Sequence, residues 1–397
     1  MDYENLMHLN LSKPRRGNFF KKYRFLLLIA SILIITTIAW SFLTSTSSVF
    51  NFAIAQINPL KSTDERVNIL MLGNAGGKHD GPYLTDSIII ASYHLKSKKT
   101  TLISVPRDLW LLGTQTKVNT VYIYGQQKSQ NGLSVAEDEI DNILGIPIHY
   151  GVRIDFRGFI KAVDLVEGVD VEVPNTFDDY NYPIEGKEND LCGLLEKEVE
   201  LSEEQISGLN LRDDHLKLKP GLNKVLVDST DKIATESADF ACRFEHINFK
   251  KGKTHMDGTT ALKFVRSRMG TNGEGSDFAR SRRQQIVLQA FRSKVLSLET
   301  LFNPGKIKGL IDAFGESFET DIPIERSLDF LKLVRNSENV SNIVLGDLGG
   351  GKSILMVPPP SEYGGAFVLI PPDNDFSAIK DYIKQRLLED SIRVEEE

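Results

Sequence analysis

The chain has 397 residues, of which 41% are hydrophobic and 25% are charged, and its formal net charge is -7 at pH 7. This composition excludes a largely disordered protein and leaves room for one large domain or two ordinary ones. The acidity argues against a nucleic-acid binder, so any anion-binding site must be local.

An apolar run near the start predicts a membrane anchor. Residues 25–43 (FLLLIASILIITTIAWSFL) carry no charge and, at about 1.5 Å per residue, can cross most of a hydrocarbon core about 30 Å thick. Basic residues precede the run and are absent from 44–56. The positive-inside rule predicts a cytoplasmic leader (1–24), a single transmembrane helix (25–43) in a bacterial cell membrane and an extracytoplasmic remainder that begins with a spacer (44–65). A cleaved signal peptide is the alternative, but the long run and long leader favour an uncleaved anchor.

Short β-branched runs follow the spacer, as in buried strands of a sheet. The last two are joined by a polar turn, which predicts that these two strands pair. The three runs are VNILMLG (67–73), SIIIASYHL (87–95) and TTLISV (100–105).

Helix signals come next. Ser134 and Glu137 form a capping-box pattern for an amphipathic helix that ends before Gly145. Asp155 is the predicted N-cap of a further helix, which lies between strands at 147–154 and 169–173. This order predicts an α/β (α+β) fold with a three-layer αβα core and a mixed central sheet.

From about Pro174 to Lys253 the periodicity fades, which indicates a loop-rich insertion (174–253). Cys192 and Cys242 fall in this segment on the exported side, where a disulfide is permitted, although sequence alone does not fix their pairing. The extracytoplasmic domain is predicted to span 66–390, followed by an acidic tail (391–397). Further predicted elements are helices at 255–265, 277–298, 306–318, 325–336 and 376–389 and a strand at VLGDL (344–348).

Arginines gather in RSRMGTNGEGSDFARSRRQQ (266–285). With Ser276 as N-cap, a helix would place Arg280, Arg283 and Gln284 on one face and point Arg282 elsewhere. If RSR is extended, Arg266 and Arg268 share one side of the chain. Two such pairs, folded together through GTNGEG, would present a fork of donors that suits a multiply charged phosphate group.

Carboxylates stand near a further arginine. Arg107 follows a strand in SVPRD, and HDGPYLTDS supplies Asp80 and Asp86 between two strands. Hard oxygen ligands beside phosphate-binding arginines suit Mg2+ bound to a pyrophosphate. A plain turn at Asp80 and a surface ion pair for Arg107 are the structural alternatives.

These segments in this order resemble the LytR-CpsA-Psr family. The motifs that carry the resemblance are TDS (85–87), SVPRD (104–108), KVNTVYIYG (117–125), DFRGFIKAVDLVEGVDVEVP (155–174), HMDGTTALKFVRSR (255–268) and SDFARSRRQQ (276–285). The resemblance implies a membrane-anchored, Mg2+-dependent phosphotransferase. Such an enzyme moves a glycopolymer, such as teichoic acid or capsule, from polyprenyl pyrophosphate to peptidoglycan and releases polyprenyl phosphate.

The resemblance also implies roles for the matching residues. Asp86 would bind magnesium and Asp277 would orient the arginines, and the chemistry would fall to Asp86 with Arg107, Arg266 and Arg268. The implied pyrophosphate ligands are Arg107, Arg266, Arg268, Arg280, Arg283 and Gln284.

Two positions depart from the family pattern. Leu84 stands where the family usually has Arg, and Asn74-Ala75 where it usually has Asp. Asp80 is the candidate substitute for the missing carboxylate, and Lys78 or His79 for the missing cation. The alternatives are therefore a polyprenyl-pyrophosphate-binding protein without catalysis and a pyrophosphatase using the same site. A DNA-binding regulator is excluded, because a leader of about 24 residues is too short for such a fold.

Overall fold

The computed structural model describes residues 59–77, 81–209, 218–234, 237–297, 314–347 and 353–392. Contacts divide the chain after Pro59, and the fold described below belongs to the second unit, Leu60–Glu397. The predicted leader, transmembrane helix and most of the spacer lie outside the described residues. Within the described ranges, no helix is both long and apolar enough to cross a membrane.

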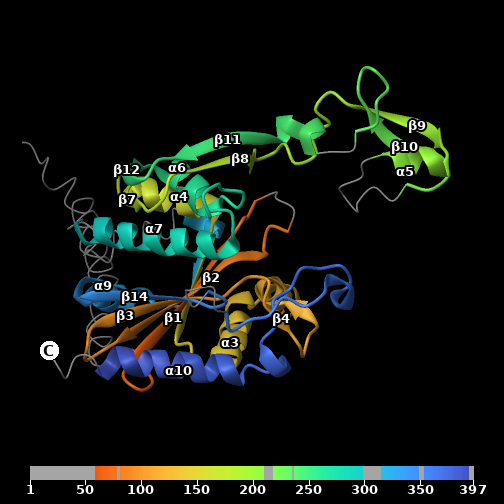
Figure 1. Cartoon of the computed structure of the whole chain (residues 1–397). Helices are drawn as coiled ribbons and strands as arrows, with labels where there is room; N and C mark the ends of the chain where they lie inside the picture. The colour runs from red at the N-terminus through yellow and green to blue at the C-terminus, as the bar shows by residue number, and fades with distance from the viewer. Residues whose placement is uncertain are drawn as a thin grey trace, which may run out of the picture. The chain divides into compact units, whose positions relative to one another are not determined.

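A mixed sheet lies at the centre of this unit, with strands in the order β13-β6-β1-β2-β3-β14 (Figure 1). β1 is antiparallel to β2 and parallel to β6, while β3 is antiparallel to β2 and parallel to β14. The predicted mixed central sheet is confirmed. The strands are β1 (Arg66–Asn74), β2 (Thr85–His94), β3 (Lys99–Ser104), β6 (Tyr150–Asp155), β13 (Phe318–Thr320) and β14 (Asn339–Val344).

The last strand corrects the prediction at VLGDL. β14 ends at Val344, where that stretch begins. Gly346 has a φ of 91°, and the Asp347 N–H donates to the Val344 carbonyl at 3.0 Å. The chain therefore forms a turn at residues whose apolar side chains had indicated a strand.

Helices cover both faces of the sheet. On one face lie α3 (Gly132–Leu144) and α10 (Ser377–Ile392), which Figure 1 shows below the strands. On the other lie α4 (Phe156–Leu165), α6 (Gly258–Arg266), α7 (Asp277–Ser297) and α9 (Ser327–Asn336). β7 (Val169–Val173) pairs with β12 (Gly252–Met256) and is not a strand of the central sheet.

The predicted caps have mixed outcomes. Asp155 accepts from the Gly158 N–H at 2.9 Å and caps α4, and the Ser276 hydroxyl accepts from the Ala279 N–H at 3.0 Å at the start of α7. The capping box at Ser134 and Glu137 is wrong, because α3 already begins at Gly132. Gly132 packs so tightly on Tyr122 of α2 (Val121–Ser129) that an added Cβ would lie 2.6 Å from the Tyr122 carbonyl, so the first position of the helix needs glycine.

The segment predicted as a loop-rich insertion contains strands. β8 (Phe177–Pro183) and β11 (Phe244–Phe249) form an antiparallel ribbon, which packs Phe177 and Phe249 on Phe264 of α6. The ribbon therefore belongs to the core. Farther along the chain, β9 (Leu195–Leu201) and β10 (Gly221–Val227) pair as an antiparallel hairpin. The helix α5 (Glu203–Gly208) lies between these two strands in the sequence.

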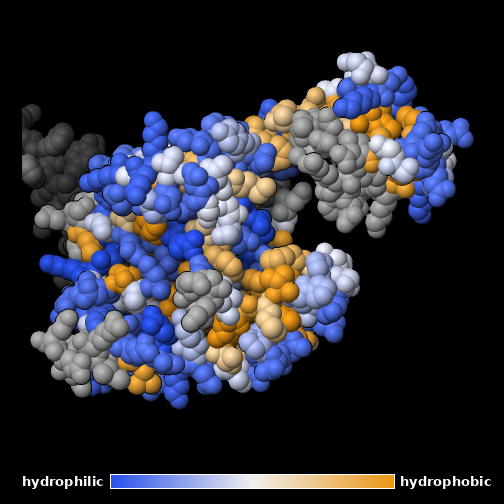
Figure 2. All heavy atoms as spheres, in the orientation of Figure 1, coloured by the Kyte–Doolittle hydropathy of each residue, from blue (hydrophilic) through white to orange (hydrophobic). Residues whose placement is uncertain are grey.

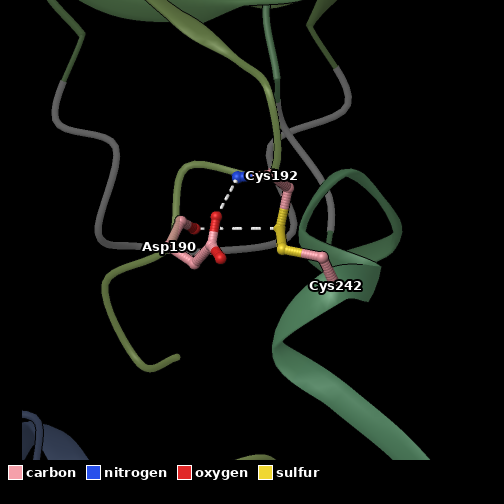
Figure 3. Close-up of side chains that lie close together, drawn as sticks. All are labelled: Asp190, Cys192 and Cys242. Atoms are coloured by element: carbon pink, nitrogen blue, oxygen red, sulfur yellow. Dashed lines mark hydrogen bonds between the residues drawn. A yellow bond between two sulfur atoms is a disulfide. The ribbon is translucent and has the colours of Figure 1, made fainter. Parts of the chain in front are cut away.

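A disulfide joins Cys192 and Cys242 where the ribbon ends, so the predicted pairing is present in the structure (Figure 3). The Cys192 N–H donates to the Asp190 carboxylate at 2.9 Å, which holds the turn beside the bridge. The two cysteines are 50 residues apart in the sequence, and the segment between them contains the β9/β10 hairpin. We call residues 192–242 the arm.

Apolar side chains gather around β4 (Trp110–Leu111), as Figure 2 shows for the face drawn in Figure 1. Exposed residues here include Leu112, Met356 and Phe367. β4 pairs with β5 (Thr116–Lys117).

Candidate functional site

A cavity of about 750 Å³ opens between the central sheet and the layer of α4, α6, α7 and α9. This volume lies within the range of about 300–1,000 Å³ that ligand pockets usually have. Its wall is predominantly apolar over most of its length. The sheet contributes Met71, Ile89, Val152 and Ile154, and the helices contribute Phe159, Leu288, Phe291, Phe330 and Val334.

Charged residues line the same cavity where β2 begins and α7 starts. Asp86 and Arg107 meet here, and Arg107 donates to Asp86 Oδ1 at 2.5 Å. Arg107 Nε also lies 3.5 Å from Asp108 Oδ2. Burial opposes the charge of Arg107, but the two carboxylates outweigh it and raise the pKa of Arg107. Arg107 therefore stays charged, and both residues line the cavity.

Asp277 sits between two of the arginines. Its carboxylate lies 3.3 Å from Arg268 Nε and 3.1 Å from Arg280 NH2. Burial, together with the charges of Arg107 and Arg268, lowers the pKa of Arg280 to about 10 in spite of Asp277. The orienting role predicted for Asp277 therefore fits the geometry. Excess positive charge is held close together here, which favours an incoming anion.

Arg266 reaches the cavity from the end of α6. Its guanidinium carbon lies 4.1 Å from the centre of the Phe156 ring and 5.6 Å from that of Tyr182. Cation–π contacts of this kind hold a guanidinium without an acid partner. Arg266 and Arg268, two residues apart, both line the cavity as predicted.

The start of α7 adds polar groups to the same end. Gln284 lines the cavity, and its Oε1 accepts from the Ser87 hydroxyl at 3.1 Å. Asp277 and Arg280 belong to the first turn of α7, where the helix dipole favours a bound anion. Within the described residues, the buried Nε atoms of Arg107 and Arg280 have no hydrogen-bond acceptor. The guanidiniums thus retain donor capacity.

Arg283 corrects the prediction from helix spacing. It is 1% exposed, and its donors go to the carbonyls of Phe264 and Ser267 and to Glu274. Among the described residues it is absent from the lining of the cavity. Three-residue spacing put Arg280 and Arg283 on one face, but Arg283 lies over α6 and the loop after it. Arg282 points away and pairs with Asp347, as predicted.

Asp86 is the carboxylate here that fits a divalent cation. Its Oδ1 accepts from Arg107, whereas its Oδ2 has no donor within the described residues, and the side chain is 35% exposed. Mg2+ is usually held by one or two carboxylates, phosphate oxygens and waters, so one partly exposed carboxylate beside phosphate-binding arginines suits it. Asp277 is occupied by two arginines, and Asp80 lies outside the described residues.

The model of the LytR_cpsA_psr family matches residues 38–350. The chain belongs to this family.

Similar curated proteins are named polyisoprenyl-teichoic acid–peptidoglycan teichoic acid transferases. TagV of Bacillus subtilis (strain 168) is 26% identical over 250 residues, which cover 62% of this chain and 46% of TagV. TagU of Enterococcus faecalis (strain ATCC 700802 / V583) is 25% identical over 268 residues, 66% of this chain and 63% of TagU. The chain thus spans less than two thirds of these relatives. A solved structure of TagT bound to LIIa-WTA is 19% identical, covers 84% of this chain and 94% of that chain, and has a TM-score of 0.50, which bears on the fold alone.

The departures from the LytR_cpsA_psr pattern have structural explanations. Asn74 is fully buried, donates to the Pro82 carbonyl at 2.6 Å and accepts from Arg153 at 3.2 Å. A carboxylate here would set an oxygen against the Pro82 carbonyl, so the amide suits this loop. Leu84 packs on Gly81, where an added Cβ would lie 2.6 Å from it. Among the described residues, neither lines the cavity, and Lys78, His79 and Asp80 lie outside them.

Some polar residues that the sequence patterns did not assign to the site also line the cavity, among them Ser87 and Asp179. Ser87 lies inside the TDS motif and was not singled out, although its alternation in β2 places it on the side of Ile89. Asp179 is 1% exposed and lines the cavity from β8. No local signal separates Asp179 from its neighbour Asp178, because the pattern FDDY has no strand periodicity.

Proposed function

We propose that this protein is a membrane-anchored phosphotransferase, which moves a glycopolymer from a polyprenyl-pyrophosphate carrier to a hydroxyl group of peptidoglycan. The observation that carries the proposal is a single cavity with two chemistries. Its apolar length suits a prenyl chain, and the arginines at one end suit a pyrophosphate. The names of the relatives TagV and TagU support a teichoic acid as the polymer.

The proposed reaction is a displacement at phosphorus. The acceptor hydroxyl oxygen attacks the phosphorus that bears the glycan, and the bond from this phosphorus to the bridging oxygen breaks. Polyprenyl phosphate leaves with that oxygen, the glycan becomes attached to peptidoglycan through a phosphodiester, and the hydroxyl proton passes to a base or solvent. Such a transfer asks the protein mainly to position the groups and to stabilise charge.

The residues divide this work by position. Arg280 is buried and Arg107 is partly buried, each has a spare donor, and both would hold the pyrophosphate oxygens. Arg266 and Arg268 line the cavity from the end of α6 and the residues after it, and would neutralise charge on the leaving polyprenyl phosphate. Asp277 keeps Arg268 and Arg280 aimed at one point. Gln284 would donate its amide while Ser87 holds its oxygen.

We propose Mg2+ as the cofactor, with Asp86 as its protein ligand. When bound, Mg2+ would supply neutralisation of the pyrophosphate charge. The Arg107 contact holds one oxygen of the Asp86 carboxylate, and the second oxygen would bind the metal.

We place the domain outside the cytoplasmic membrane. The charge pattern around residues 25–43 supports this orientation. The disulfide between Cys192 and Cys242 also supports it, since such bonds persist mainly in oxidising compartments.

The buried Asn74 and the packed Leu84 favour one second candidate, a protein that binds polyprenyl pyrophosphate without turning it over. A transfer assay separates the candidates. The full chain in detergent is incubated with a short polyprenyl-pyrophosphate glycan and peptidoglycan oligomers, with and without Mg2+. The transferase predicts polyprenyl phosphate together with a glycan–peptidoglycan adduct.

Variants assign the activity to this site. Arg268→Ala and Asp86→Ala should each lower the rate by about 10²-fold or more, as loss of a charge-stabilising group does. Arg282→Ala, on the surface with Asp347, is the matched control and should keep the rate. Intact lipid under all conditions would establish the binding protein, and polyprenyl phosphate without an adduct would establish a pyrophosphatase.

A further inference from the structure

The short segment Arg266–Met269 carries two of the cavity arginines but has little secondary structure of its own. α6 ends at Arg266, and Ser267 leaves the helix with a ψ of 134°. A segment of this kind would be free to move, yet its arginines must meet one small ligand group. Its backbone contacts therefore decide where both guanidiniums lie.

Asp179 of β8 holds this segment from one side. Its Oδ2 accepts from the Ser267 hydroxyl at 2.7 Å, from the Arg268 N–H at 3.3 Å and from the Met269 N–H at 3.2 Å. Its Oδ1 accepts from the Asn181 N–H at 3.0 Å. Among the described residues, no Lys or Arg lies within ion-pairing distance of this 1% exposed carboxylate. A buried charge satisfied by donors from consecutive residues fixes their backbone strongly.

Arg283 of α7 holds the same segment from the other side. It donates to the Phe264 carbonyl at 2.9 Å and to the Ser267 carbonyl at 2.5 Å, which are groups that the end of α6 leaves without partners. It also donates to Glu274 Oε2 at 2.6 Å, and so ties down the glycine-rich loop. Asp179 thus binds the N–H groups of the turn while Arg283 binds its carbonyls.

We propose that Asp179 and Arg283 are positioning residues that clamp Arg266–Met269 and thereby set the place of the Arg268 guanidinium at the anion-binding end of the cavity. We expect neither residue to bind the ligand, because Asp179 Oδ2 accepts from the segment and the Arg283 guanidinium donates to the segment and to the loop after it. The β8/β11 ribbon would then be part of the site. This inference rests on the proposed function in so far as the anion is a prenyl pyrophosphate.

The clamp predicts coupling between Asp179 and Arg268. Asp179→Asn keeps the size of the side chain but replaces the carboxylate that accepts from the Arg268 and Met269 N–H groups with a neutral amide. Affinity for geranylgeranyl pyrophosphate, measured by calorimetry on the full chain in detergent, should fall about tenfold, or about 1.4 kcal/mol. The affinity of Arg268→Ala should fall at least as far. The double variant should bind no more weakly than Arg268→Ala alone. Additive losses would refute the clamp.

Matched variants test whether the effect is local. Asp178→Asn changes the neighbouring carboxylate, which bonds His246 and Asn248 on the ribbon, and should keep the affinity within about twofold. Ser267→Ala removes one donor of the clamp and should weaken binding in the same direction as Asp179→Asn but less. An unchanged affinity in Ser267→Ala together with an equal loss in Asp178→Asn would mean a general packing effect.

Hydrogen exchange tests the clamp even when the proposed function fails. In Asp179→Asn the amides of Arg268 and Met269 should exchange at least about tenfold faster without ligand, while amides of β1 should not change. If wild type fails to bind the prenyl pyrophosphate, the proposed function is wrong, and this exchange result alone decides the clamp. Unchanged exchange at both amides would overturn it.

Discussion

The two faces of the central sheet are built from the same strands but do opposite work. Toward α3 and α10, Leu70, Ile88 and Ile90 belong to a continuous buried core. Toward α7, Met71 and Ile89 of the same strands border the cavity. Successive side chains of a strand point to opposite faces of the sheet. A substitution at one residue therefore tests stability, and a substitution at its neighbour tests ligand binding. In a sheet with one packed face and one face that borders a cavity, one set of side chains can stabilise the fold and the other can bind a lipid.

Neighbouring isoleucines of β2 give the sharpest test of this comparison. Ile90→Ala should lower the free energy of unfolding by about 2–5 kcal/mol, because it opens a cavity in a packed core. Ile89→Ala enlarges an existing cavity and should cost clearly less, about 1–2 kcal/mol for the lost apolar burial. Urea unfolding of the two variants in parallel measures the difference. Equal losses would mean that the second face is packed like the first.

Filling the hollow face should break binding without breaking the fold. Val152→Trp places a large ring in the cavity and should weaken binding of geranylgeranyl pyrophosphate by at least about 100-fold, which is about 2.8 kcal/mol. The thermal midpoint should stay near that of wild type, since the ring enters open space. A large drop in that midpoint with unchanged binding would show that the space is closed in solution.

Sequence patterns predicted much of the sheet and only part of the site. β-branched runs identified β1, β2 and β3 because buried strands require them, and the family motifs identified Asp86, Arg107 and Arg268. Arg283 was misplaced because helix spacing gives a face but not the neighbour on that face. Asp179 was missed because its role depends on a turn about 88 residues away, as the Ser267 contact shows. Long-range contacts of this kind leave no local pattern.

The packed face also contains a carboxyl group whose effect on the stability of the fold depends on pH. Burial, with repulsion from Asp321 and Asp138, raises the pKa of Glu137 on α3 from 4.5 to about 7. A raised carboxyl pKa makes the folded state bind more protons, so wild type should lose stability as pH rises from about 4.5 to 7. Glu137→Gln should remove this loss and be more stable at pH 8 by up to about 2 kcal/mol, allowing for partial exposure. Unfolding of both proteins at pH 5 and pH 8 measures it, and parallel curves would contradict the assignment.

The arm should matter least to the cavity. Cys192→Ser with Cys242→Ser opens the bridge but leaves the β8/β11 pairing, which is formed by backbone hydrogen bonds. Amides of β9 and β10 should exchange faster, because an isolated hairpin is marginally stable. Affinity for geranylgeranyl pyrophosphate should stay within about twofold of wild type. A larger loss would extend the site beyond the ribbon.

In the proposed function, one cavity holds a prenyl chain along its apolar length and a pyrophosphate among the arginines. The most direct measurement is an experimental structure of the chain with geranylgeranyl pyrophosphate bound. We expect phosphate oxygens within hydrogen-bond distance of Arg107, Arg268 and Arg280, and a prenyl chain that runs past Ile89 toward Phe330. A ligand bound elsewhere, or a reversed one with its pyrophosphate near Phe330, would contradict it.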